Sequence, residues 1–299
     1  MKTTNKLLIT LSILLAVDLI AFGIVVFFDN KNEAINNIDN IRLGITPNPD
    51  RLETPKTIEN FFKVAGKHGS FELEPCYTAS YNEAISGFIH GSLDLLYINP
   101  AYYLYLKKNY NADVVAFQLY SKQEMEYNHA VLLSIKPFGH LAETRGKRIS
   151  FTNKYSMCGY LVPERHLRNN ITEPLETWFS KIDFSGSDQY SLDALLKGET
   201  DIIACDLLSL IHNTTYKKNA RKLHLMWISQ KLPESLICVS AKSMESDFYN
   251  RKSLVELGNS LWQLSRRETL YNRNSMNFEP PHFEYMKELD KLEKFLFPN

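Results

Sequence analysis

Ser156, Met157, Cys158 and Gly159 lead into a predicted helix over residues 159–167, and they are the segment best suited to binding chemistry. The first turn of a helix has free backbone N–H groups and a partial positive charge, which together favour an anion. The Ser156 hydroxyl can cap that turn and can also donate a hydrogen bond. The segment therefore predicts either an oxyanion site or an ordinary capped helix start.

The cysteines offer a second chemistry, because Cys76, Cys158 and Cys205 all lie at predicted strand ends or in a loop beside them. Three thiols brought together can bind a soft metal or metalloid. A disulfide in an oxidising compartment is a second interpretation, and plain burial of small side chains is a third. Cys238 lies within a predicted buried strand, and no C-x-x-C spacing favours a metal site.

Catalysis has little support in this sequence. It has no G-x-S-x-G, H-E-x-x-H or P-loop spacing, and its 8 histidines are dispersed. We therefore expect no enzymatic activity and no cofactor. The 34 basic and 34 acidic residues balance, so a global basic field for nucleic acid is absent.

Alternating strand and helix signals predict the scaffold that positions these residues. Predicted strands cover 41–45, 71–75, 95–98, 148–151, 201–205 and 235–240, and predicted helices cover 57–66, 81–90, 159–167, 190–196 and 207–211. Such alternation is typical of α/β units around a mostly parallel sheet. The alternation restarts near Gly146, which predicts two lobes, and the chain after Ser243 is predicted to be mostly helical. Ligands of open α/β sheets bind beyond the carboxyl ends of the strands.

Residues 7–28 are predominantly apolar and carry a single charge, that of Asp18. A membrane-spanning helix needs about 20 such residues, whereas the apolar core of a cleaved signal peptide has about 7–15. Lys2 and Lys6 precede the segment, which places residues 1–6 in the cytoplasm and the chain after the 29–40 linker outside it. We expect an uncleaved, single-pass anchor in a bacterial inner membrane, with the bulk of the chain in the periplasm. A cleaved signal peptide is the alternative.

Five segments follow one another in an order that resembles a known family. They are IRLGITPNPD (41–50), GSLDLLYINPAYYLY (91–105), LAETRGKRISF (141–151), SMCGYLVP (156–163) and FSGSDQYSLDALLKGETDIIACD (184–206). Over residues 41–242 the sequence resembles the periplasmic substrate-binding proteins of phosphate, phosphite and phosphonate ABC transporters.

The resemblance implies an α/β type 2 periplasmic-binding-protein fold. Two lobes would be joined by two crossing strands, near 129–135 and 236–240. The first lobe would contain 41–135 plus 241–299 and the second 136–240. Ligand binding between the lobes would close them by a hinge motion.

The resemblance also implies which residues face the ligand. Tyr81 and Tyr103 match ligand-facing tyrosines of the family, and Tyr102 takes that role if the register shifts by one residue. Ser156 keeps the first hydroxyl of the family's Ser-Thr-Ser-Gly segment. Met157 and Cys158 replace the other two hydroxyl residues and Gly159 is retained, so backbone donors survive but two hydroxyl donors do not.

Three further positions match ligand contacts on the second lobe. Asp188 stands where the family often has His, although it also reads as the N-cap of the following helix. Gln189 replaces a Glu that recognises an amino group in aminoalkyl-phosphonate binders. Asp206 matches a strand-end Asp that contacts ligand.

We therefore expect a membrane-anchored, extracytoplasmic solute-binding protein that closes on a small oxyanion resembling phosphonate, phosphite or phosphate. Its membrane partner would be an ABC permease, as in the family, or a sensor kinase or cyclase, as the anchor suggests. Some members of the wider family sense arsenite through cysteine beside a histidine kinase. Arsenite sensing through Cys76, Cys158 and Cys205 is thus one alternative, and a ligand-free interaction module is another.

Overall fold

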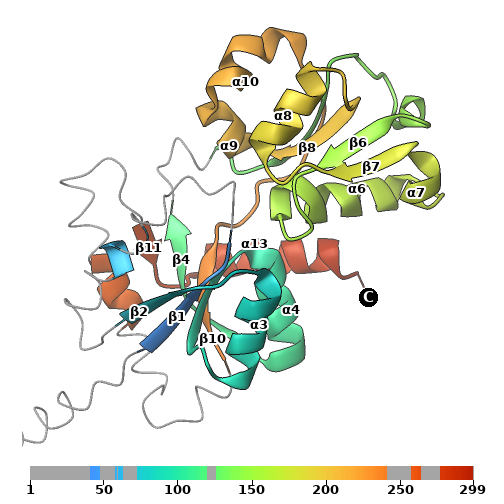
Figure 1. Ribbon diagram of the computed structural model, residues 1–299. Coiled ribbons are helices and arrows are strands. Elements are labelled where there is room, and N and C mark those ends of the chain that lie inside the picture. The colour runs from blue at the N-terminus through green and yellow to red at the C-terminus, as the bar shows by residue number, and fades with distance from the viewer. Residues whose placement is uncertain are drawn as a thin grey trace, which may run out of the picture.

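The computed structural model describes residues 41–47, 58, 60–62, 73–119, 126–240, 257–263 and 277–298, which form two α/β lobes, each around its own sheet (Figure 1). The predicted anchor at 7–28 and the linker at 29–40 lie outside these residues. Within the described ranges, no helix is long and apolar enough to cross a membrane.

The first sheet has six strands in the order β11-β4-β10-β3-β1-β2. Their bounds are β1 Ile41–Ile45, β2 Leu73–Tyr77, β3 Leu95–Ile98, β4 Asp113–Leu119, β10 Leu236–Val239 and β11 Asn277–Glu279. Strand β1 pairs in parallel with β2 and β3, whereas β10 is antiparallel to both of its neighbours. The sheet is therefore mixed, because a strand returning from the second lobe is inserted into it.

The second sheet has five strands in the order β7-β6-β8-β5-β9. Their bounds are β5 Ala130–Ser134, β6 Arg148–Phe151, β7 Lys181–Phe184, β8 Ile202–Asp206 and β9 His224–Ile228. Strand β6 is parallel to β7 and β8, and β5 is antiparallel to β8 and β9. This sheet too is mixed where the chain enters and leaves the lobe.

Helices flank both sheets. In the first lobe they are α3 Tyr81–His90, α4 Pro100–Tyr110 and α13 Phe283–Leu296, with 257–263 also helical. In the second lobe they are η1 Leu141–Thr144, the π-helical turn η2 Met157–Leu161, α6 Val162–Asn170, α7 Leu175–Trp178, α8 Asp188–Leu196, α9 Leu207–His212, α10 Thr214–Asn219 and η3 Ala220–Lys222.

The strand pairing shows where the chain changes from one sheet to the other. Strand β5 pairs only within the second sheet and β10 only within the first. The chain therefore passes from the first sheet to the second before β5 and returns to the first before β10. The connection before β10 is pinned to the one before β5, since Asn128 and Leu232 exchange hydrogen bonds of 2.7 and 2.9 Å.

Side chains from both lobes share one hydrophobic cluster. It contains Phe88, Leu104 and Leu289 of the first lobe together with Met157 and Val162 of the second. Helix α13 contributes to this junction, and Figure 1 shows it extending from the first lobe to beneath α6. The two lobes are therefore in direct apolar contact.

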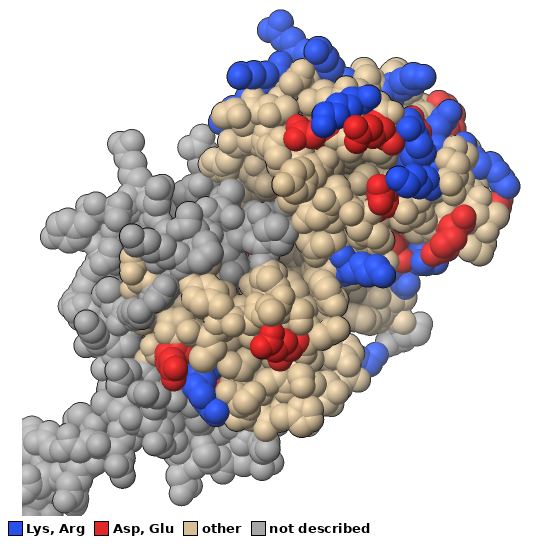
Figure 2. Space-filling model, viewed as in Figure 1, with Lys and Arg blue, Asp and Glu red and all other residues tan. Residues whose placement is uncertain are grey.

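The outer surface of the second lobe carries interspersed Lys, Arg, Asp and Glu side chains, as Figure 2 shows. The described part of the first lobe that is visible there is mostly uncharged. Neither surface in this view is a continuous basic field of the kind that binds nucleic acid.

Candidate functional site

The loop before η2 lies where the two lobes meet, and Ser156 caps the turn as predicted. Its Oγ accepts a hydrogen bond of 2.9 Å from the Gly159 N–H. Position 159 must be glycine here, because an added Cβ would lie 2.0 Å from Thr152 Oγ1. The Thr152 hydroxyl is fully buried and has no hydrogen-bond partner among the described residues.

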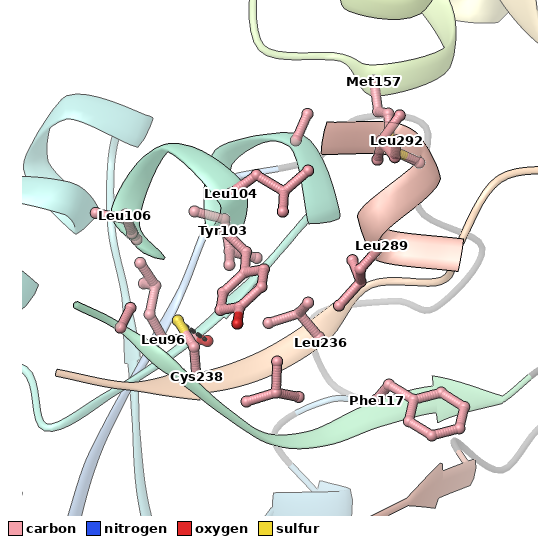
Figure 3. Packing of buried hydrophobic residues seen from close by; sticks show 14 of the residues in the cluster. Leu96, Tyr103, Leu104, Leu106, Phe117, Met157, Leu236, Cys238, Leu289 and Leu292 are labelled. Carbon is pink, nitrogen blue, oxygen red and sulfur yellow. Dashed lines mark hydrogen bonds between the residues drawn. The ribbon is translucent and has the colours of Figure 1, made fainter. Parts of the chain in front are cut away.

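Met157 and Cys158 are buried rather than open to a cleft. They are 8% and 5% exposed and belong to the cluster shared by the two lobes. Figure 3 shows Met157 reaching down from the second lobe onto Leu292 of α13. These side chains therefore attach the second lobe to the first instead of supplying the hydroxyl donors that the family places there.

On the first lobe, the side chains of Tyr81, Asn99 and Tyr102 lie against this loop. Tyr81 is 5% exposed and is the first residue of α3, and Asn99 caps α4 through a 3.1 Å bond from the Tyr102 N–H. The Asn99 amide also donates to the Tyr81 hydroxyl over 3.3 Å. Tyr81 and Tyr102 lie with ring centroids 5.2 Å apart. The structure thus brings Tyr81 and Ser156, predicted from opposite lobes, to one junction.

Tyr103 lies elsewhere. It is 1% exposed and points into the first-lobe core beside Leu96, Leu236 and Cys238 (Figure 3). Burial raises the pKa of its phenol well above the ordinary range. Its neighbour Tyr102 takes the position at the junction, because only one of two adjacent residues can face outward from that side of α4.

Asp188 and Asp206 meet on the second lobe. Asp188 is 2% exposed, and its Oδ1 accepts a 3.1 Å hydrogen bond from the Asp206 N–H. The N-cap of α8 is Ser187 and not Asp188, which is the first residue of the helix. Asp206 in turn caps α9 by accepting from the Leu208 N–H over 2.9 Å.

Gln189 is engaged within its own lobe. Its amide donates to Asp193 over 2.9 Å, and its carbonyl oxygen accepts from Asn213 over 2.5 Å. Both ends of the side chain are thus used in holding α8 to the start of α10. Its predicted part in recognising a ligand stays a prediction.

Glu234 is a candidate that the sequence did not reveal. It lies between β9 and β10, is 4% exposed, and its Oε1 has no hydrogen-bond partner among the described residues. Burial raises the pKa of this carboxyl well above its ordinary value, and the nearby Asp206 raises it further. Its only sequence signal is an acidic residue directly after Pro233, next to a predicted buried strand.

The structure does not bring the three candidate thiols together. Cys158 lies in the cluster at the junction, Cys205 lies in a separate second-lobe cluster with Leu192 and Ile203, and Cys76 is partly exposed on β2. Cys76, Cys158, Cys205 and Cys238 form no disulfide with one another, so the disulfide interpretation is wrong. Across the described ranges, no group of three His, Cys, Asp or Glu side chains could hold a metal ion.

Comparison with known proteins decides the family. Residues 43–281 match the family profile of the periplasmic substrate-binding protein of phosphonate ABC transporters. The chain belongs to this family. Members are substrate-binding transport proteins and not enzymes, and they act outside the cytoplasm with an ABC transporter.

Solved structures of this family and its neighbours share the fold. PhnD1 of Prochlorococcus marinus (MIT 9301), in complex with methylphosphonate, is 18% identical with a TM-score of 0.63, covering 86% of this chain and 97% of its own. XAC2383 of Xanthomonas citri, bound to ATP, is 15% identical with a TM-score of 0.67, covering 86% and 96%. A binding protein component of an ABC phosphonate transporter (PA3383) from Pseudomonas aeruginosa is 15% identical with a TM-score of 0.57, covering 87% of each chain. No curated protein matches the sequence.

Proposed function

We propose that this phosphonate-family binding protein takes up a small phosphonate carrying an amino group between its lobes, and presents it to an ABC permease. The family supports the substrate class and the kind of transporter. The amino group is proposed because of Glu234, whose buried carboxyl has one oxygen with no hydrogen-bond partner among the described residues and lies near a second carboxylate, that of Asp206.

A buried carboxylate is unfavourable unless a cation or hydrogen-bond donors compensate it. Here Asp206 adds negative charge near Glu234, and Asp188 is bonded to the Asp206 backbone. An ammonium group placed among these side chains would satisfy the free Glu234 oxygen and favour its ionised form. Binding would then lower the raised pKa of Glu234 and so favour loss of its proton.

The phosphonate end would lie against the start of η2. The Ser156 hydroxyl, backbone N–H groups of that turn and the buried Thr152 hydroxyl are the donors available on the second lobe. Asn99 and Tyr81 face them from the first lobe. Backbone donors at a helix start bind oxyanions without the two side-chain hydroxyls that Met157 and Cys158 have replaced.

The ligand assignment is tested by titration calorimetry of the full-length protein with 2-aminoethylphosphonate and with ethylphosphonate, which lacks only the amine. We expect tighter binding of the amine by at least about tenfold, from one charge-assisted hydrogen bond. Glu234→Gln should remove that preference and leave ethylphosphonate affinity unchanged. Because the ionised carboxyl binds the ammonium, affinity for the amine should rise with pH through the raised pKa of Glu234, and the variant should lose this rise.

Equal affinity for the two phosphonates would refute the amine assignment. Binding of neither would favour a second function, a ligand-free interaction module. The specific observation behind that alternative is the packing of Met157 and Cys158 into the first lobe. Arsenite sensing has less support, because Cys205 and Cys158 lie in different clusters.

We also propose that residues 7–28 anchor the protein in the inner membrane beside its partner. The apolar length of the segment supports the anchor. Retention of the full chain in the membrane fraction after an alkaline wash tests it, and release into the soluble fraction would refute it. The family favours a permease as partner over the sensor kinase or cyclase that the anchor alone suggests.

A further inference from the structure

Tyr155 belongs to the second lobe, but its side chain lies among residues of the first. A tight turn at Asn153 holds Tyr155 in this position. The Asn153 side chain accepts a 3.0 Å hydrogen bond from the Tyr155 N–H, and the Asn153 carbonyl accepts a 3.1 Å hydrogen bond from the Ser156 N–H. The Tyr155 ring is stacked on Tyr81 with centroids 4.7 Å apart and planes 1° from parallel. It also contacts the ring of Tyr102 at 5.6 Å.

Hydrogen bonds hold the same residue at both ends. The Tyr155 carbonyl accepts a 2.9 Å bond from the side-chain amide of Asn99, and its hydroxyl donates to Asn82 Oδ1 over 3.3 Å. Backbone, ring and hydroxyl of one second-lobe residue are thus each bound to a different side chain of the first lobe.

Contacts on the α13 side support this attachment. Arg165 of α6 donates to the Phe295 carbonyl over 3.2 Å, and Met157 packs on Leu292. All of these contacts are made directly between residues of the two lobes. The closed arrangement of the lobes therefore has a source of stabilisation within the protein itself.

We infer that Tyr155 is a latch that keeps the two lobes closed on one another before ligand binds. The latch acts in the ligand-free protein. Its consequence rests on the proposed function: the membrane partner would meet the closed form of the ligand-free protein, and ligand would enter only when the Tyr155 ring separates from the Tyr81 ring. Tyr155 is a positioning residue, because it fixes how the two lobes lie relative to one another.

Hydrogen–deuterium exchange of the full-length protein, in detergent and without ligand, tests the latch. In Tyr155→Ala we expect amides in residues 99–106 and 156–162, which pack across the junction, to exchange about tenfold faster, the shift that one well-stacked aromatic pair can produce. Tyr81→Ala, made on the opposite lobe, should give the same pattern. Tyr155→Phe keeps the ring and should exchange like the unmodified protein.

The control is Tyr190→Ala, a second-lobe tyrosine that is 65% exposed on α8. It should leave exchange at the junction unchanged. Unaltered exchange in a folded Tyr155→Ala protein would overturn the latch, as would equal effects of Tyr155→Ala and Tyr190→Ala. Because no ligand is present, neither result depends on which phosphonate the protein binds.

Discussion

The two lobes contain the same helix–strand unit, in residues 80–99 and 187–206, and the two segments align without a gap. Each begins with a serine N-cap, Ser80 or Ser187, and its helix is followed by a left-handed glycine, Gly91 at φ 81° or Gly198 at φ 73°. Each ends at a residue that caps the next helix, which is Asn99 directly after β3 or Asp206 at the end of β8. The two lobes thus contain the same structural unit.

An arginine bracket fixes the unit in both lobes. Arg42 on β1 binds both carboxylate oxygens of Asp94 and the Gly91 carbonyl, with distances of 2.8–2.9 Å. In the second lobe, Arg148 on β6 binds Asp201 and the Gly198 carbonyl in the same way, each at 2.9 Å. The bracket ties a strand, a helix end and the next strand together, far from the junction.

The difference between the units lies at the opposite end, which faces the junction. The first helical residue is Tyr81 in one lobe and Asp188 in the other, and the residue capping the next helix is Asn99 or Asp206. The first lobe therefore presents neutral donors and a ring, and the second presents carboxylates. The capping serine, the glycine and the bracket aspartate are the same in both units, whereas the residues at the junction differ in charge, as expected of a binding site placed between the lobes.

The two brackets are predicted to contribute different amounts to the free energy of unfolding. The Asp94 side chain is 13% exposed and that of Asp201 is 32% exposed, whereas the arginines are about equally exposed, at 39% for Arg42 and 37% for Arg148. The brackets therefore differ in the burial of the carboxylate. We expect Asp94→Ala to lower the unfolding free energy by about 2 kcal/mol and Asp201→Ala to lower it by less, because water screens the more exposed Asp201 pair more strongly. Urea unfolding of the full-length protein measures both.

Asp183→Ala is the control, because its ion pair with Lys181 is exposed and should contribute about 0.5 kcal/mol or less. Equal losses at Asp94 and Asp201 would show that burial does not distinguish the two brackets. A larger loss at Asp201 would reverse the comparison.

Local signals predicted the shared unit well. Strand β3 and helix α3 have the predicted bounds, because Gly91 ends the helix and an apolar run marks the strand. The sequence did not predict the π-helical turn at Met157–Leu161, since apolar residues there suit several helical forms. Strand β11 was missed as well, because three residues carry no periodic pattern and the strand depends on pairing with β4.

Contacts across the lobes were the least predictable part of the site. Tyr102 and Tyr103 are adjacent, and only the orientation of α4 decides which one is buried. Asn99, Tyr155 and Glu234 matter through partners more than 50 residues away. Their residue types alone indicate a cap, a surface ring and a surface acid.

The smallest predicted difference concerns the threonines that follow β1 and β6. Thr46 Oγ1 donates to the Tyr97 carbonyl over 3.1 Å, whereas the equally buried Thr152 hydroxyl has no partner among the described residues. Thermal unfolding should show Thr46→Val destabilised by about 1 kcal/mol, and Thr152→Val unchanged or stabilised by up to about 1 kcal/mol, because it removes an unsatisfied polar group. If Thr152→Val instead weakens phosphonate binding without lowering stability, the hydroxyl serves the ligand. A loss of stability matching that of Thr46→Val would mean that Thr152 has a structural partner, and it would remove Thr152 from the binding site.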